Sequence, residues 1–172
     1  NYYQIKNIIY FYKNLLTFWH NTVILKLFQG EKGRNDLRIT HEADYAIRVT
    51  YCLALAGEKQ CAKDISEVTG VTLRFALKIL RKLTQAGITK SYKGVAGGYE
   101  LNHSPSEISL GAIIECIDGP IAINHCLANE FQCTHMGTQK ECDFHRVFSE
   151  INRSLRDQLC SITMDRFLPP QK

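Results

Sequence analysis

The sequence predicts a mainly α-helical protein with one small β-hairpin, which makes it an α+β fold. Three observations favour this fold. Apolar residues recur at helical spacing in several segments, two short strand-like segments flank a glycine-rich run, and residues 143–162 carry a long amphipathic pattern. The chain has 172 residues, of which 45% are hydrophobic, so it can form one or two small domains with an ordinary core.

The first two predicted helices lie between residues 40 and 70. Thr40 is a suitable N-cap and Gly57 a suitable C-terminal stop for the first helix. A shorter helix is expected over 62–69, because Gly70 follows it. Apolar residues recur at every fourth position of the first helix, which indicates one buried face: Ala43, Ile47, Tyr51 and Leu55.

A third helix and a hairpin follow. Thr72 is a candidate N-cap for a helix that ends near Ala86, just before a glycine. Residues 93–98 contain three glycines and suit a hairpin loop, with strands expected over 88–92 and 99–101. Helix, turn, helix and hairpin is the element order of a winged helix-turn-helix, to which we assign residues 37–102.

The remaining residues are predicted to form two further parts. Residues 103–142 comprise a linker helix, over 109–117, and a Cys-rich loop. Residues 143–172 comprise a long dimerisation helix and a C-terminal tail. The long helix carries an apolar stripe at spacings of three and four, which suits packing against a second copy of the chain: Phe144, Phe148, Ile151, Leu155, Leu159 and Ile162.

Residues 1–36 differ in composition from the rest. Of the first 28 residues, 22 are Asn, Tyr, Ile, Lys, Phe or Leu, all of which A/T-rich codons can specify. We hypothesise that this segment is translated upstream DNA or a disordered extension, with Leu37 as the initiation site. Residues 32–34 can be encoded by a purine tract that resembles a ribosome-binding site. The alternative is a true amphipathic N-terminal helix.

The charge and the cysteine content limit the classes of function that the protein can have. The net charge of +4 conceals a division, because residues 37–102 carry +4 and residues 103–172 carry −3. Seven cysteines cannot all pair, so reduced thiols or a metal site in the cytoplasm are expected. The sequence contains no apolar run of the roughly 18–20 residues that a membrane span needs. We therefore expect neither a membrane nor a small-molecule substrate as a partner.

The third helix has the pattern of a DNA-reading helix. Between Val71 and Gln85 there is no acidic residue, and the basic residues share one side while leucines share the other. A helix anchored by one face and basic on the other can enter a major groove, and a glycine-rich hairpin can approach the flanking minor groove. The alternative is a solvated basic helix. The predicted DNA-binding residues are Thr72, Arg74, Lys78, Arg81, Lys82, Lys90 and Lys93.

The Cys-rich loop contains a complete ligand set. Cys126, Cys133, Cys142 and His145 lie within 20 residues, and three thiolates with one imidazole suit Zn²⁺ or an iron–sulfur cluster. The alternatives are buried unliganded cysteines, a thiol redox switch or a catalytic Cys–His pair. The sequence contains no G-x-S-x-G, P-loop or G-x-G-x-x-G motif, so an enzyme is disfavoured.

Taken together, these segments resemble the IscR/NsrR family of bacterial regulators. Residues 37–46 (LRITHEADYA) resemble its N-terminus, and Val71–Leu83 and 93–99 resemble its recognition helix and wing. The Cys-x6-Cys-x8-Cys-x2-His run resembles its cluster-binding loop. The resemblance covers essentially all of residues 37–168.

The resemblance implies a homodimeric transcription factor, usually a repressor, that binds double-stranded DNA under the control of an iron–sulfur cluster. Cys126, Cys133 and Cys142 would be its thiolate ligands. His145 as the fourth ligand implies a 2Fe–2S cluster, which we favour, whereas Asp44, from the partner subunit, would correspond to a 4Fe–4S cluster. A regulator of the same fold that uses zinc or a thiol switch is the alternative, and an electron-transfer protein or cluster carrier is the competing class.

Overall fold

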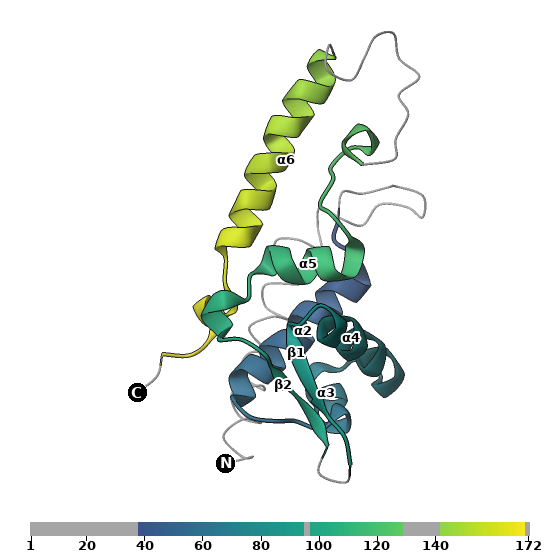
Figure 1. The fold of residues 1–172 in the computed structure, drawn as a ribbon, viewed down its shortest axis with the longest axis vertical. Helices are drawn as coiled ribbons and strands as arrows, with labels where there is room; N and C mark the ends of the chain where they lie inside the picture. The colour runs from purple at the N-terminus through teal and green to yellow at the C-terminus, as the bar shows by residue number, and fades with distance from the viewer. Residues whose placement is uncertain (1–37, 95–96, 129–141, 171–172) are drawn as a thin grey trace, which may run out of the picture. The chain divides into compact units, whose positions relative to one another are not determined.

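The structure is a computed structural model that describes residues 38–94, 97–128 and 142–170 (Figure 1). The hypothesis on residues 1–36 therefore lies outside the described residues. Helices α2, α3 and α4 come first, the hairpin β1–β2 follows, and helices α5 and α6 complete the order of the main elements. This mainly helical fold with one antiparallel hairpin confirms the predicted fold class. Within the described ranges, no helix has the length and hydropathy to cross a membrane.

Helix α2 (His41–Ala56) begins and ends where the sequence predicts. The Thr40 hydroxyl accepts a hydrogen bond from the amide of Ala43 at 3.1 Å, and Gly57 adopts a left-handed φ of 63°. Helix α3 (Ala62–Thr69) ends in the same way at Gly70. Helix α4 (Leu73–Gln85) follows Thr72, whose side chain makes no capping hydrogen bond. Local capping interactions thus determine where α2 and α3 begin and end.

The buried face of α2 differs from the expected one. Ile47, Tyr51 and Leu55 are only half-buried, so the four-residue repeat does not mark the core-facing line. The buried residues follow spacings of three and four, and several are small, which lets α4 and α5 approach the α2 backbone closely. The buried line is Ala43, Ala46, Val49, Thr50, Leu53 and Ala54.

The hairpin is anchored to the segment that follows α2. Strands β1 (Thr89–Tyr92) and β2 (Gly98–Leu101) pair antiparallel, each within one residue of its predicted start. Gln60 exchanges two backbone hydrogen bonds with Tyr99, at 2.9 and 2.8 Å. A Cβ atom on Gly98 would lie 2.6 Å from the carbonyl oxygen of Gln60, so this contact requires glycine. The hairpin is therefore fixed at its base.

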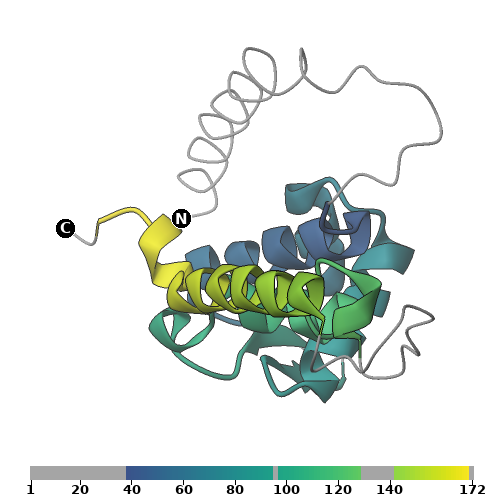
Figure 2. The same cartoon turned by 90° about the horizontal axis from the view of Figure 1, so that it is seen from above.

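The C-terminal part consists of two packed helices and a returning strand-like segment. Helix α5 (Leu110–Asp118) is capped by Ser109, and helix α6 (Asp143–Ser161) packs against α5 (Figure 2). After α6 the chain returns to the core. The amide of Leu110 donates to the carbonyl of Ile162, and the amide of Met164 donates to that of Ile108, both at 2.9 Å. Met164 is buried, so this return closes the core.

Gly111 allows the close approach of α5 and α6. A Cβ atom on Gly111 would lie 2.5 Å from Sγ of Cys160 and 3.0 Å from its backbone nitrogen. Replacing glycine by alanine in a helix ordinarily stabilises the fold by about 1 kcal/mol. At this position steric overlap dominates instead, because the nearest atoms belong to a packed neighbouring helix.

We therefore expect Gly111→Ala to lower the free energy of unfolding by about 1–3 kcal/mol, as measured by urea denaturation. Adding Cys160→Ala removes the nearest clashing atom and should restore part of the loss. A Gly111→Ala protein as stable as the wild type would contradict this packing.

Candidate nucleic-acid interface and cysteine loop

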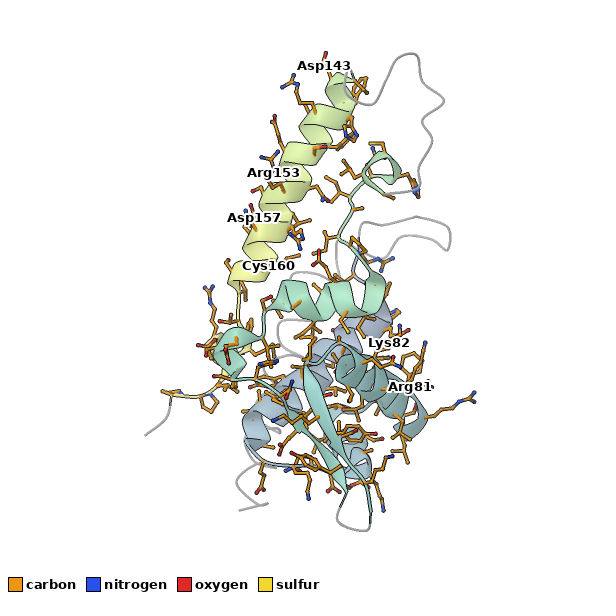
Figure 3. All side chains as sticks on the ribbon, viewed as in Figure 1. Arg81, Lys82, Asp143, Arg153, Asp157 and Cys160 are labelled. Atoms are coloured by element: carbon orange, nitrogen blue, oxygen red, sulfur yellow. The ribbon has the colours of Figure 1, made fainter. Side chains whose placement is uncertain are left out.

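Helix α4 presents one buried and one exposed face. The apolar face fills the core between α2, α3 and α5, with four residues that have no exposed area: Ala76, Ile79, Leu80 and Leu83. Arg74, Lys78 and Arg81 lie on the exposed side, and Figure 3 shows Arg81 on the outer surface of α4. The predicted separation of basic residues and leucines holds for Leu80 and Leu83 but is wrong for Leu73 and Leu77, which are 44% and 41% exposed on the basic side.

The basic residues of α4 differ in their partners. Within the described part of the chain, Arg74 and Arg81 form no salt bridge, whereas Lys78 and Lys82 both bind Glu42 of α2, at 2.8 and 2.7 Å. Lys82 is half-buried and also donates to the carbonyl of Ile117 at 3.4 Å. Its contact with DNA stays a prediction, and its observed role is to hold α4 against α2 and α5.

Glu42 was not singled out by the sequence pattern. Its carboxylate accepts hydrogen bonds from Lys78 and Lys82, and these two cations hold its pKa below the usual value for glutamate. The side chain is 19% exposed, so the pair is partly shielded from water. No local sequence signal marks this residue, because its partners lie 36 and 40 positions away in the chain.

The wing places two lysines at its surface. Lys90 is exposed and lies opposite Glu100 in the hairpin register, and the Tyr92 hydroxyl donates to the Glu100 carboxylate at 2.5 Å. Lys93 is exposed beside Gly94, whose φ of 99° favours glycine. Strand β1 packs against α4. The hairpin lysines and the basic face of α4 therefore belong to adjoining elements.

The predicted cluster ligands fall on two elements that pack together. Cys126 lies in a short 3₁₀ helix, η3 (His125–Leu127), which contacts α6. Cys142 directly precedes α6 and His145 lies in its first turn. Cys133 is outside the described residues. Among the described residues, Cys126, Cys142 and His145 do not form a group that could hold a metal ion.

Two features of these residues nevertheless fit a ligand role. Nδ1 of His145 is buried and has no hydrogen-bond partner in the described part of the chain. An uncompensated buried nitrogen is costly, and metal coordination is one way to satisfy it. Cys126 and Cys142 are half-buried free thiols. Asp44, the alternative ligand, pairs with Arg48 at 2.7 Å.

Other cysteines are unsuited to coordination. Burial raises the pKa of the Cys52 thiol to about 11, and burial also raises that of Cys116. Their burial therefore disfavours the thiolate form that a metal ligand requires. Cys160 packs against Gly111. All three cysteines lie within helices, in α2, α5 and α6, and are half-buried.

The segment before the cysteine loop contacts α6 and the residue that caps α2. Glu115 forms two hydrogen bonds with Arg156 of α6, at 2.7 and 3.1 Å, and this guanidinium lowers the pKa of Glu115. Asp118 accepts hydrogen bonds from the backbone and hydroxyl of Thr40. The Asn152 amide donates to the carbonyl of Ile121 at 2.9 Å, while its oxygen accepts from the amide of residue 123. Residues 115–123 thus link α2, α6 and the loop.

An exposed basic helix, supported by two further helices and flanked by a β-hairpin, defines a winged-helix DNA-binding protein. The chain belongs to the Rrf2 family, whose model, described as "Iron-dependent Transcriptional regulator", matches residues 39–170. The chain is accordingly a DNA-binding transcriptional regulator and not an enzyme. This confirms the family resemblance that the sequence indicated.

Individual relatives agree with this assignment. An Rrf2-like HTH-type transcriptional regulator of Rhodobacter capsulatus is 30% identical over 137 residues, which cover 76% of this chain and 91% of the relative. The regulator IscR of Pectobacterium carotovorum is 27% identical and the match covers 77% and 79% of the two chains. The solved structure of CymR, the global cysteine regulator of Bacillus subtilis, shares the fold, with a TM-score of 0.61, 22% identity and coverage of 77% and 96%.

We expect Glu42→Gln to lower the free energy of unfolding by about 1 kcal/mol at pH 7, because two lysines lose their carboxylate partner. A carboxylate with a lowered pKa stabilises the fold above its unfolded-state value of about 4.3, and this contribution disappears as the pH falls through the folded-state pKa. The difference between variant and wild type should therefore shrink at acidic pH in urea denaturation. Glu67→Gln, at an exposed site of α3, is the matched control. A Glu42→Gln effect that is independent of pH would contradict the ion pairs as its cause.

Proposed function

We propose that the protein is a homodimeric cytoplasmic repressor whose operator binding is controlled by an iron–sulfur cluster. Cys126, Cys133, Cys142 and His145 would hold the cluster, with the 2Fe–2S type favoured; Asp44 of the partner subunit is the alternative fourth ligand to a 4Fe–4S cluster. The observation that carries the proposal is the buried Nδ1 of His145, which has no hydrogen-bond partner among the described residues and lies in the first turn of the helix that Cys142 precedes. The iron dependence in the description of the family model supports it.

When bound, the cluster would supply a centre that is sensitive to iron supply, oxidants and nitric oxide. The protein's own contribution is a loop tethered at both ends. Asn152 holds the backbone at residues 121 and 123, and Cys142 continues directly into α6. Ligation of the cysteines would order residues 121–142 against α6, and its loss would release them.

Residues 117 and 118, which precede this loop, contact α4 and the N-terminus of α2. Ile117 accepts a hydrogen bond from Lys82 of α4, and Asp118 holds the N-terminus of α2. A shift of residues 115–123 would therefore alter the orientation of α4 relative to its copy in a dimer. Two half-sites lie about 34 Å apart on DNA, so a small reorientation would change operator affinity.

Helix α6 supplies the surface for a second copy. None of the residues of α6 is fully buried within the chain, and Phe144 and Ile151 remain 71% and 50% exposed. Phe148, Leu155 and Leu159 are half-buried against the same chain. The exposed apolar positions lie at the N-terminal end of α6, where a partner would cover them.

Anaerobic purification tests the cluster directly. We expect brown protein with visible absorption, iron and sulfide in equal amounts, and the mass of a dimer in solution. His145→Ala and Cys142→Ser should each lose the visible absorption and change operator affinity. Cys52→Ser, a variant of a half-buried cysteine outside the loop, is the control and should keep the absorption.

Other outcomes would overturn parts of this proposal. Colourless protein with stoichiometric zinc would favour the alternative regulator with a structural metal, and colourless metal-free protein would favour a thiol switch. A monomeric mass would contradict the homodimer.

The DNA contacts are tested by their salt dependence. We propose that Thr72, Arg74, Lys78, Arg81, Lys82, Lys90 and Lys93 contact the operator. Arg81→Ala should weaken binding to all duplexes and lower the slope of log affinity against log salt by about 1 for each copy, because one phosphate contact is lost. Arg153→Ala, at an exposed site on α6 (Figure 3), removes the same charge elsewhere. Equal effects of the two variants would contradict a specific role of α4.

A further inference from the structure

Two exposed leucines interrupt the basic face of α4. Leu73 is the first residue of the helix and is 44% exposed, and Leu77, one turn later, is 41% exposed. Together with Arg74, Lys78 and Arg81 they line one shallow depression on the protein surface. The other leucines of α4, Leu80 and Leu83, are fully buried, so Leu73 and Leu77 are not needed to fill the core.

The charges around these leucines restrict what can cover them. Helix α4 contains no acidic residue, and Arg74 and Arg81 form no salt bridge within the described residues. An uncharged protein surface would bury both guanidinium groups without a partner, at a high desolvation cost. A ligand that fits must combine negative charge with small apolar groups. Duplex DNA does so, because phosphates flank a major groove that displays the 5-methyl group of thymine.

RNA fits this surface less well. Its bases carry no thymine methyl group, and the major groove of an A-form helix is too narrow for a protein helix. The position of the leucines also agrees with the geometry of helix-turn-helix proteins, in which the N-terminal residues of the second helix approach base edges. Leu73 and Leu77 occupy the N-terminal half of α4, whereas Arg81 lies further along the helix, where phosphate contacts are expected.

From this arrangement we infer that Leu73 and Leu77 determine operator sequence by packing against thymine 5-methyl groups in the major groove. A cytosine at the same position carries only hydrogen at C5, so the contact with the methyl group is lost. Its neighbouring 4-amino group would also lose its water without gaining a partner, because leucine forms no hydrogen bonds. The selectivity of α4 therefore favours A·T pairs at two positions of each half-site. This inference rests on the proposed contact between α4 and DNA.

The test removes the methyl group and nothing else. A preferred duplex is first selected from random sequences with the purified protein, in the metal-bound or metal-free form that binds more tightly. Each thymine of that site is then replaced singly by deoxyuridine, which keeps base pairing but lacks the 5-methyl group. We expect about a fourfold loss of affinity at two positions of each half-site, which corresponds to about 0.8 kcal/mol for one buried methyl group. Replacement outside the selected site is the nucleic-acid control.

Variants assign each effect to a side chain. Leu77→Ala should weaken binding to the thymine duplex and abolish the effect of deoxyuridine at one position, while Leu73→Ala should do so at another. Leu77→Met keeps an apolar contact and should retain the effect. Ile39→Ala removes an apolar side chain of similar exposure, 47%, outside α4 and should leave the deoxyuridine response unchanged. Thermal unfolding of each variant verifies that it is folded.

The outcomes separate this inference from the proposed function. Tight binding of a selected duplex with no effect of any deoxyuridine would overturn thymine reading and leave DNA recognition by α4 intact. A deoxyuridine effect that persists in both alanine variants would also overturn it, since another residue would then contact the methyl group. Failure to enrich any duplex, with weak binding to all sequences, would overturn the proposed function together with this inference.

Discussion

The contact of α5 with three other helices sets the geometry of the molecule. Helix α5 packs against α2, α4 and α6, and its glycine at position 111 lets α6 approach to van der Waals distance. At its C-terminal end, the Cys116 thiol and the Ile117 carbonyl both bind atoms of Lys82 in α4. The position of the DNA-reading helix relative to α6 therefore depends on one short helix. Because protein interiors have low compressibility, a displacement of α5 would be transmitted to the helices packed against it.

In the proposed function, this arrangement would let a small chain combine DNA binding with sensing. The segment that leaves α5 makes polar contacts with α2 and α6 before it reaches the cysteine loop, through Asp118, Glu115 and residues 121–123. These hydrogen bonds are exposed or partly buried. Each therefore contributes only modestly to the free energy of folding and can be broken at low cost. The apolar core of α2, α3 and α4 does not include these polar contacts. A switch built in this way changes orientation without unfolding the DNA-binding part.

The sequence allowed prediction of those features that are determined locally. Thr40, Gly57 and Ser109 set helix boundaries through hydrogen bonds or backbone angles within four residues, so the helices appear where expected. Features that depend on distant residues could not be predicted. Glu42 gains its role from lysines on another helix, and Asn152 from backbone groups about 30 positions earlier. The ligand role of the loop residues stays a prediction, because their spacing in the sequence does not define how their elements meet.

The distribution of charge connects the basic helix to the need for a second copy. The DNA-binding half carries a formal charge of +4, but Arg48, Lys78 and Lys82 are bound to carboxylates of the same domain. The cations of α4 and the wing that lack a carboxylate partner within the described residues are Arg74, Arg81, Lys90 and Lys93. Affinity for DNA depends on the number of phosphates neutralised, and so few cations bind weakly at physiological salt. In the proposed homodimer that number would double and the spacing between the two copies of α4 would be fixed, so dimerisation would determine both affinity and half-site geometry. In the inferred recognition, Leu73 and Leu77 select the base sequence without adding charge. The preference for a DNA sequence can therefore vary without changing the electrostatic contribution to DNA affinity.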